Sequence, residues 1–467
     1  MTEPVTVPRA EHPISRRDID PDALKVLYRL HESGYIAYLV GGSVRDLLLS
    51  RRPKDFDIGT SAHPYQVKKL FRNCWIIGRR FRLAHVRFGL KAIEVATFRR
   101  HVPAGSESEA SLHEPEPQAI DPAEQGRLDA QQLLIKHDNT FGTPEEDAFR
   151  RDFTINALFY DIGSYSIIDY VGGLQDLKDG IIRSIGDPNE RFQEDPVRML
   201  RAIVMAARLN FKIDRPVVDA IATHRELIAT ASPARMIEEY YKILRSGYAE
   251  QTFRSLAEHR LLEPVTPEIQ RGVKDNGLWN ALAALDAYRR KFESAPVSLR
   301  NPVLLGSLLI PLGLMPRQEK RNWEPAEDEV DGNVPEPVVR KSKFKRPPKE
   351  PILKIGTLPI ARGDTERLRQ LLSLQSRIAD VEMSPRAKRA LMNRGSFEDA
   401  MTWFEIHGNA PAVLEHWKGF MEALQAEAAR EPRADTGEAP VDGESQGRRR
   451  RGRRRRGRRG PRRPPES

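Results

Sequence analysis

The stretch that decides the fold covers residues 41–60 and reads GGSVRDLLLSRRPKDFDIGT. An apolar run over residues 35–40 leads into it and predicts a strand, and a second strand is expected over residues 55–59. Between them, Gly41 and Gly42 form a turn that opens into a short helix. Because glycine has no Cβ, backbone N–H groups of this turn can approach a phosphate at the positive end of the helix. The stretch therefore predicts a phosphate-binding turn.

Two aspartates lie near the end of the same stretch. Asp55 and Asp57 are two residues apart on the predicted strand, so both carboxylates are expected on one face of the sheet. Paired carboxylates suit Mg²⁺ or Mn²⁺, whose remaining ligands can come from substrate phosphates. A phosphate-binding turn beside such a pair predicts phosphoryl or nucleotidyl transfer.

Three motifs in a fixed order carry a family resemblance. They are GGSVRD at residues 41–46 followed by D-x-D at 55–57, RRDFTINA at 150–157, and EDPVR at 194–198. The set resembles the polymerase β-like nucleotidyltransferases, and within them the family of bacterial tRNA nucleotidyltransferases and poly(A) polymerases. The resemblance covers roughly residues 20–250. It implies a fold of the α+β class, with a catalytic head followed by all-helical neck and body domains.

The resemblance also implies the chemistry of the carboxylates. Asp55 and Asp57 would hold two metal ions that activate an attacking 3′-hydroxyl and stabilise the leaving pyrophosphate. A third carboxylate is expected, and two residues compete for the place. Glu94 lies on a predicted strand over residues 93–98, where alternation could aim it at the pair, whereas Asp152 belongs to the RRDFTIN motif. We assign the catalytic role to Asp55, Asp57 and Asp152, because the motif of Asp152 is the more specific.

Residues of all three motifs are expected to bind the nucleotide. The guanidinium groups of Arg150 and Arg151 match triphosphate oxygens, and Asn156 is expected on the same helical face as Asp152, within reach of the ribose. The full set assigned to nucleotide binding is Gly41, Gly42, Arg45, Arg150, Arg151, Asn156, Asp195 and Arg198.

The base itself is expected to meet Asp195 and Arg198. The two residues are three apart at a predicted helix start, so their side chains are neighbours. In the related enzymes this motif reads the hydrogen-bonding edge of the incoming base, so that Asp195 would accept from an amino group and Arg198 would donate to ring nitrogens. Arg201, one turn further on, extends the same contact. Asp195 before Pro196 also reads as a simple helix N-cap.

Two basic segments are expected to contact RNA. Residues 76–86 alternate basic and apolar side chains, and they resemble a segment that separates bacterial poly(A) polymerases from their CCA-adding relatives. Residues 448–467 contain twelve arginines and one glutamate. This composition predicts a disordered tail that binds RNA phosphates electrostatically, whatever the RNA sequence. The residues assigned to RNA binding are Arg79, Arg80, Arg82, Arg448, Arg449, Arg450, Arg453 and Arg454.

Composition limits the class of protein. The net charge is +10 over 467 residues, and the arginine-rich tail accounts for all of it, since the rest of the chain carries −1. One cysteine, Cys74, excludes an internal disulfide and fits a reducing cytoplasm. Residues 1–20 contain no signal peptide, and the most apolar window, residues 302–315, is too short to span a bilayer. We expect a cytoplasmic monomer without a membrane span.

Changes in composition and periodicity predict the domain boundaries. The expected parts are an N-terminal extension (1–19), a catalytic head (20–163) with a mobile insertion (101–130), a nucleotide- and RNA-binding neck (164–255), a helical body (256–316), a charged linker (317–352), a C-terminal helical region (353–428) and a disordered tail (429–467).

The resemblance implies template-independent addition of AMP from ATP to RNA 3′ ends, and hence a role in mRNA and small-RNA decay, with RNA-decay machinery and an RNA chaperone as partners. The nearest alternative is a CCA-adding tRNA nucleotidyltransferase, which shares every catalytic motif. A non-catalytic RNA-binding protein is a third interpretation. The presence of both Asp55 and Asp57 argues against it, since RNA binding needs neither.

Overall fold

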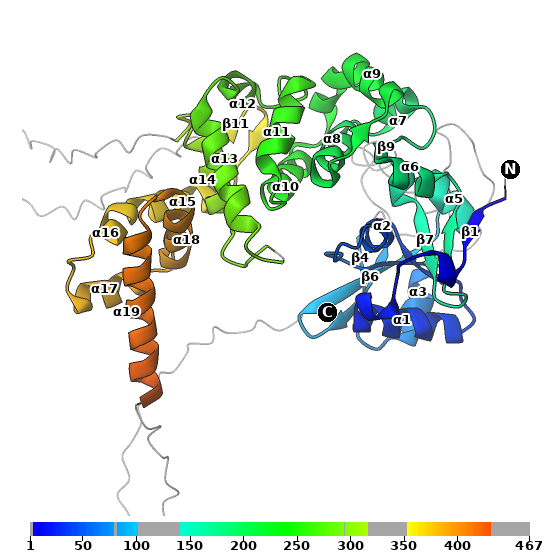
Figure 1. Ribbon diagram of the computed structural model, residues 1–467, viewed down its shortest axis with the longest axis horizontal. Helices are drawn as coiled ribbons and strands as arrows, with labels where there is room; N and C mark the ends of the chain where they lie inside the picture. The colour runs from blue at the N-terminus through cyan, green and yellow to red at the C-terminus, as the bar shows by residue number, and fades with distance from the viewer. Residues whose placement is uncertain (1–2, 79–81, 101–140, 294, 316–352, 431–467) are drawn as a thin grey trace, which may run out of the picture. The chain divides into compact units, whose positions relative to one another are not determined.

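The computed structural model describes residues 3–78, 82–100, 141–293, 295–315 and 353–430 (Figure 1). The chain divides into two compact units, Met1–Pro411 and Ala412–Ser467. The described part of the second unit is a single helix, since α19 spans Pro411–Arg430. The insertion, the charged linker and the arginine-rich tail lie outside the described residues.

An eight-stranded sheet forms the N-terminal part of the first unit (Figure 1). Its spatial order is β1-β8-β7-β2-β3-β6-β5-β4. β3 and β6 pair in parallel, and the other neighbours are antiparallel. The strands are β1 (Val5–Val7), β2 (Ala37–Val40), β3 (Asp57–Thr60), β4 (Cys74–Ile77), β5 (Leu83–Phe88), β6 (Lys91–Thr97), β7 (Leu158–Asp161) and β8 (Ile167–Asp169).

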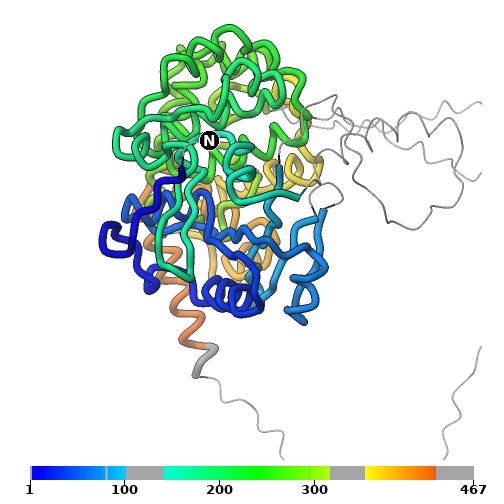
Figure 2. Tube along the Cα trace, turned by 90° about the vertical axis from the view of Figure 1, so that its right-hand side faces the viewer, coloured from blue at the N-terminus to red at the C-terminus, as the bar shows by residue number. Residues whose placement is uncertain are grey.

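Two strands of this sheet come from outside the segment expected to form the head. β1 lies in the expected extension, and β8 lies in the expected neck. The two pair through Thr6 and Ile168, and Figure 2 shows the blue N-terminal trace beside the turquoise strands. The sheet therefore runs past both expected boundaries, because long-range strand pairing decides where it ends.

Helices α1 (Pro21–Glu32) and α3 (Pro64–Leu70) cover one side of the sheet, where α3 contacts β4, β5 and β6. The predicted helix over residues 21–32 is confirmed, and its start follows from the sequence. The Asp20 carboxylate accepts hydrogen bonds from the backbone N–H groups of Asp22 and Ala23. Val26, Leu27 and Leu30 form the buried stripe that packs the helix on the sheet.

An aromatic cluster fills part of the other side. The ring of Phe159 on β7 lies 5.8 Å from that of Tyr170 and 6.1 Å from that of Tyr38 on β2. Phe98, just after β6, packs against Tyr38 and Phe159. Short helices complete this part of the head: α2 (Gly42–Leu48), α5 (Pro144–Phe149), the 3₁₀ helix η3 (Thr154–Asn156) and α6 (Gly173–Asp179).

The rest of the described chain is mainly helical, as expected. The predicted helix over residues 197–209 is confirmed as α8, whereas the one over residues 217–230 is split into α9 and the 3₁₀ helix η4. The helices after the head are α7 (Pro188–Glu194), α8 (Val197–Leu209), α9 (Arg215–His224), η4 (Arg225–Thr230), α10 (Pro233–Leu244), α11 (Ala249–Glu258), α12 (Pro267–Gly272), α13 (Asn276–Arg289), α14 (Asn301–Leu309), α15 (Arg362–Ser373), α16 (Gln375–Ala379), α17 (Pro385–Met392) and α18 (Phe397–His407).

The apolar window over residues 302–315 forms a core helix. α14 is buried from Pro302 to Leu309 and contacts α13, α15 and α18. Its apolar surface is therefore covered by protein. In the part of the chain that the structure describes, no helix has the length and apolarity needed to cross a membrane.

Candidate active site

The predicted glycine turn is present between β2 and α2. Gly41 has φ +73°, a left-handed conformation that favours glycine, and its N–H donates to the carbonyl of Leu158. A Cβ on Gly41 would lie 3.0 Å from Nη1 of Arg151. The turn therefore needs a glycine for its backbone shape and for the close approach of an arginine. Phosphate binding at this turn stays a prediction.

The carboxylate of Asp57 lies beside that of Glu94. Asp57 begins β3, and the parallel pairing of Ile58 with Val95 places Asp57 and Glu94 on adjacent strands. Desolvation, followed by the charges of Glu94 and Asp55, raises the pKa of Asp57 to about 6, while Arg151 opposes the rise. The three acids therefore form one acidic cluster.

Asp55 reaches this cluster without being on the strand. β3 begins only at Asp57, so the expected strand start at residue 55 is wrong. Both aspartates are exposed on the surface, although the atoms packed around Asp57 desolvate its carboxylate. Lys54 Nζ lies 3.8 Å from the Asp55 carboxylate. The charge of Asp55 acts on Asp57 from the loop before β3, whereas both residues were expected on one strand.

The donor chemistry of the acidic cluster fits a hard divalent cation. Desolvation is the main cause of the raised pKa of Asp57, and repulsion from Glu94 and Asp55 adds to it, so a bound cation would offset part of the rise. Within the described residues, no group of three or more His, Cys, Asp or Glu side chains is placed so that it could hold a metal ion. Mg²⁺ binds through one or two carboxylates together with water and substrate phosphates, so metal binding by Asp55 and Asp57 stays a prediction.

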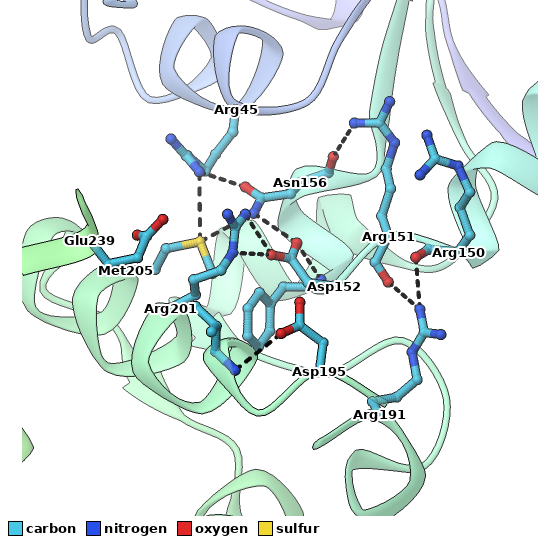
Figure 3. Close-up of polar contacts among 12 residues, drawn as sticks. Arg45, Arg150, Arg151, Asp152, Asn156, Arg191, Asp195, Arg201, Met205 and Glu239 are labelled. Atoms are coloured by element: carbon cyan, nitrogen blue, oxygen red, sulfur yellow. Dashed lines mark hydrogen bonds and ion pairs between the residues drawn. The ribbon is translucent and has the colours of Figure 1, made fainter. Parts of the chain in front are cut away.

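Asp152 is held in a different set of contacts (Figure 3). Its Oδ1 accepts from the Phe153 N–H at 2.9 Å and from Asn156 Nδ2 at 3.2 Å. Its Oδ2 lies 2.7 Å from both Nε and Nη2 of Arg201 on α8. Desolvation would raise the pKa of Asp152, but Arg201 and these hydrogen bonds outweigh it and hold the pKa below the ordinary value. Both carboxylate oxygens are thus committed to protein donors.

Asn156 connects this ion pair to the glycine turn. It lies on the 3₁₀ helix η3, so the expected α-helical face shared with Asp152 is wrong, although the two side chains do meet. Its Oδ1 accepts from Arg45 Nη1 at 2.5 Å, and Arg45 also pairs with Asp46. Arg45 is 5% exposed. Its contribution to a nucleotide site would therefore be to position Asn156.

Arg150 and Arg151 share one buried carboxylate that the sequence analysis missed. Asp147 is 2% exposed, and its two oxygens lie 2.7 Å from Arg150 Nη2 and 2.8 Å from Arg151 Nη2. Arg151 also lies 5.3 Å from the ring centre of Phe159. The i, i+3 and i, i+4 spacing of Asp147 before the two arginines was the available signal. Both guanidinium groups are therefore held in fixed orientations.

The expected base-reading residues are held by different partners: Arg235 holds Asp195, and Glu194 holds Arg198. The Asp195 carboxylate receives two hydrogen bonds from Arg235 on α10, at 2.9 and 2.7 Å. Arg198 Nη1 donates to Glu194 at 2.8 Å, and Arg191 Nη2 donates to the backbone of residues 149–151. Asp195 also accepts from the Val197 N–H at 3.2 Å, but the N-cap residue of α8 is Pro196, so the expected N-cap position of Asp195 is wrong. No pattern in the sequence pairs Arg235 with Asp195, because 40 positions separate them.

Arg235→Ala is expected to raise the KM for ATP about tenfold, a loss close to that of one charge-assisted hydrogen bond. Without Arg235, the Asp195 carboxylate loses its bidentate partner and with it the fixed direction of its acceptor oxygens. Steady-state kinetics with ATP and with CTP measure the change. Arg254→Ala is the matched control, since Arg254 pairs with Glu250 on its own helix. An unchanged KM and an unchanged preference for ATP would contradict the role of Arg235.

The predicted RNA-binding arginines are mostly outside the described residues. Only Arg82 is described, directly before β5 and with φ 41°. Arg79, Arg80 and the arginines of the C-terminal tail lie outside. Their contact with RNA stays a prediction.

Comparison with known proteins agrees with the motifs. Residues 37–183 match the poly A polymerase head domain. Residues 210–272 match a second family model, described as "Probable RNA and SrmB-binding site of polymerase A". The first match contains the glycine turn, the acidic cluster and the RRDFTIN motif, whereas Asp195 and Arg198 lie between the two.

Curated relatives confirm the predicted resemblance. The chain is 51% identical over 271 residues to Poly(A) polymerase I of Salmonella typhi, covering 58% of this chain and 55% of that protein. It is 36% identical over 248 residues to the CCA-adding enzyme of Lactobacillus helveticus, covering 53% and 56%. The chain thus spans about half the length of the curated relatives that it matches.

A solved structure supports the fold. The crystal structure of Bacillus stearothermophilus CCA-adding enzyme in complex with CTP aligns with a TM-score of 0.54 and 26% identity, over 87% of this chain and 84% of that one. The predicted α+β class, with a nucleotidyltransferase head followed by helical domains, is confirmed.

Proposed function

We propose that this protein is a polynucleotide adenylyltransferase that adds AMP from ATP to the 3′-hydroxyl of RNA without a template. The observation that carries the proposal is the acidic cluster of Asp55, Asp57 and Glu94 in a segment that matches the poly A polymerase head. In the reaction, the RNA 3′-oxygen forms a bond to the α-phosphorus of ATP. The bond from that phosphorus to the bridging oxygen breaks, pyrophosphate leaves and the hydroxyl gives up its proton.

We propose Asp55 and Asp57 as the metal ligands and Glu94 as the third carboxylate. A Mg²⁺ or Mn²⁺ ion held there supplies Lewis acidity toward the 3′-hydroxyl and the phosphates. Glu94 is preferred to Asp152 because it lies on the strand next to Asp57, whereas both oxygens of Asp152 are bound to protein donors. Asp152 then acts as a positioning residue, through Arg201 and Asn156.

The remaining residues of the site would hold ATP. Arg150 and Arg151, oriented by Asp147, present donors to a triphosphate. Asp195, oriented by Arg235, and Arg198 would select the base. The fixed orientation of these side chains favours one nucleotide, because a preformed set of donors and acceptors penalises a base that does not match it.

RNA is the proposed partner, through the segment that matches the family's RNA-binding model and through the arginine-rich tail. We also propose a cytoplasmic monomer that acts in RNA decay. The preference for adenylation over CCA addition rests on the higher identity to Poly(A) polymerase I, 51% against 36% for the CCA-adding enzyme.

One experiment tests this function. The full-length protein is incubated with Mg²⁺, each NTP separately, and either an unstructured RNA or a tRNA that lacks its terminal CCA. We expect long adenosine tails on the unstructured RNA with ATP alone, and no defined CCA product on the tRNA. A tRNA product that ends at CCA and grows no longer would assign the protein to the CCA-adding branch. No product with any NTP would overturn the enzymatic function.

A further inference from the structure

The open face of strands β4–β6 leads directly to the acidic cluster. In register, Trp75 on β4 pairs with His85 on β5, and His85 pairs with Glu94 on β6. Glu94 in turn lies beside Asp57 on β3, next to the pair Ile58 and Val95. Because side chains alternate along each strand, Trp75, His85, Glu94 and Asp57 form one row across one face of the sheet.

This face is the one that α3 does not cover. Along β4 and β5, the buried side chains Cys74, Ala84 and Val86 alternate with more exposed ones, and α3 contacts these strands from the buried side. On the outer side, Trp75 is 51% exposed and Ile77 is 50% exposed. Two large apolar side chains thus remain in water at the edge of the sheet.

An arginine accompanies the exposed tryptophan. Arg87 on β5 is exposed, and its guanidinium carbon lies 5.6 Å from the ring centre of Trp75. An exposed aromatic ring beside a guanidinium group combines a surface for base stacking with a positive charge for the phosphate that follows. Such stacking tolerates any base, as required of a site for an RNA without a fixed sequence.

The distance from Asp57 to Trp75 along this row matches a few nucleotides of single-stranded RNA. Three strand spacings of roughly 4.8 Å separate β4 from β3, or about 14 Å in all. A single strand that ends with its 3′-hydroxyl at Asp57 would therefore reach Trp75 only a few nucleotides upstream. His85 Nε2 lies 3.7 Å from the Glu94 carboxylate, so the row between the two ends is polar.

We propose that Trp75, Ile77 and Arg87 form a stacking platform for the single-stranded RNA just upstream of the 3′ end that is extended. The proposal rests on the proposed function, because the acidic cluster defines where the 3′ end lies. It adds a subsite in which an aromatic ring holds the bases and an arginine holds a phosphate. The occupant is single-stranded RNA of any sequence.

The test measures binding and catalysis separately. Binding of a labelled single-stranded oligoadenylate to the full-length protein is titrated without ATP and metal, for the wild type and for Trp75→Ala, Trp75→Phe and Arg87→Ala. Tyr65→Ala is the matched control, since Tyr65 is 60% exposed on α3, which covers the opposite side of the sheet. The KM values for RNA and for ATP are then measured for the same proteins.

We expect Trp75→Ala to raise the Kd and the KM for RNA about fivefold or more, and Trp75→Phe to restore most of the loss. Arg87→Ala should lower the salt slope of binding by roughly 0.7, the value for one phosphate contact on a single strand. The KM for ATP and the Tyr65→Ala variant should stay at wild-type values.

Two results would overturn the platform. One is wild-type RNA binding by Trp75→Ala in a protein that still extends RNA, which leaves the proposed function intact. The other is a self-associating wild-type protein that Trp75→Ala makes monomeric without changing RNA binding, which would make this face a contact between copies. A wild-type protein that transfers no AMP would instead refute the proposed function, and the titration would still report on the platform.

Discussion

Asp57→Asn is expected to lower the rate of AMP addition by about a thousandfold or more while RNA binding stays unchanged. A thousandfold loss corresponds to about 4 kcal/mol of transition-state stabilisation, the scale expected when a catalytic metal loses a charged ligand. The substitution keeps the shape of the side chain and removes a charge from the acidic cluster. RNA binding should persist because it depends on basic and aromatic residues elsewhere.

Single-turnover kinetics with Mg²⁺ measure the rate, and calorimetric titration with Mn²⁺ measures metal binding independently of activity. Asp55→Asn should behave in the same way as Asp57→Asn. Asp22→Asn is the control, since Asp22 is a carboxylate of the same head that pairs with Lys25 at 2.8 Å on its own helix. Near-wild-type turnover in either cluster variant would refute the assignment of the metal ligands.

Glu94→Gln and Asp152→Asn are expected to change different kinetic parameters. Glu94 contributes its charge to the acidic cluster, so its loss should lower kcat about a hundredfold and leave the KM for ATP unchanged. Asp152 neutralises Arg201, and removing the charge of this mostly buried carboxylate leaves the partly exposed Arg201 guanidinium without its partner. Asp152→Asn should therefore raise the KM for ATP and lower the Tm, with a smaller effect on kcat.

A double-mutant cycle tests whether Asp152 acts through Arg201. If Asp152 acts through Arg201, the effects of Asp152→Asn and Arg201→Ala on the KM for ATP will not add, because each change removes the same contact. A loss of kcat in Asp152→Asn as large as that in Asp57→Asn would instead make Asp152 the third carboxylate. Full activity in Glu94→Gln would support the same conclusion.

Local sequence signals predicted much of the fold. The alternation of helix and strand patterns around residues 21–60 indicated the core of the head, and α1 has the predicted bounds because its cap and its apolar stripe are both local. The sheet was harder to delimit. β1 and β8 are short, and they join the sheet only through pairing with each other and with β7. Such pairing depends on partners far away in the chain.

In the candidate site, too, local sequence signals predicted some residues, and contacts between distant elements decided the others. The motifs drew attention to Asp55, Asp57, Asp152, Asp195 and Arg198 because their spacing is specific. The partners that orient them were missed where they come from distant elements, as Arg235 does for Asp195. Asp147 could have been found, since it precedes Arg150 and Arg151 by one helical turn.

By itself, the sequence determined the class of the fold and the residue types of the chemistry, because short motifs and periodic patterns record local backbone shape and the ligands that phosphates and metals require. Only the tertiary structure showed which of the two candidate carboxylates lies on the strand next to Asp57. The sequence favoured Asp152 over Glu94 because of its motif, but parallel pairing of β3 with β6 brings Glu94 to Asp57, whereas α8 supplies Arg201 to Asp152. The role of a carboxylate depends on which charges lie within a few ångströms of it, and chain folding sets those distances.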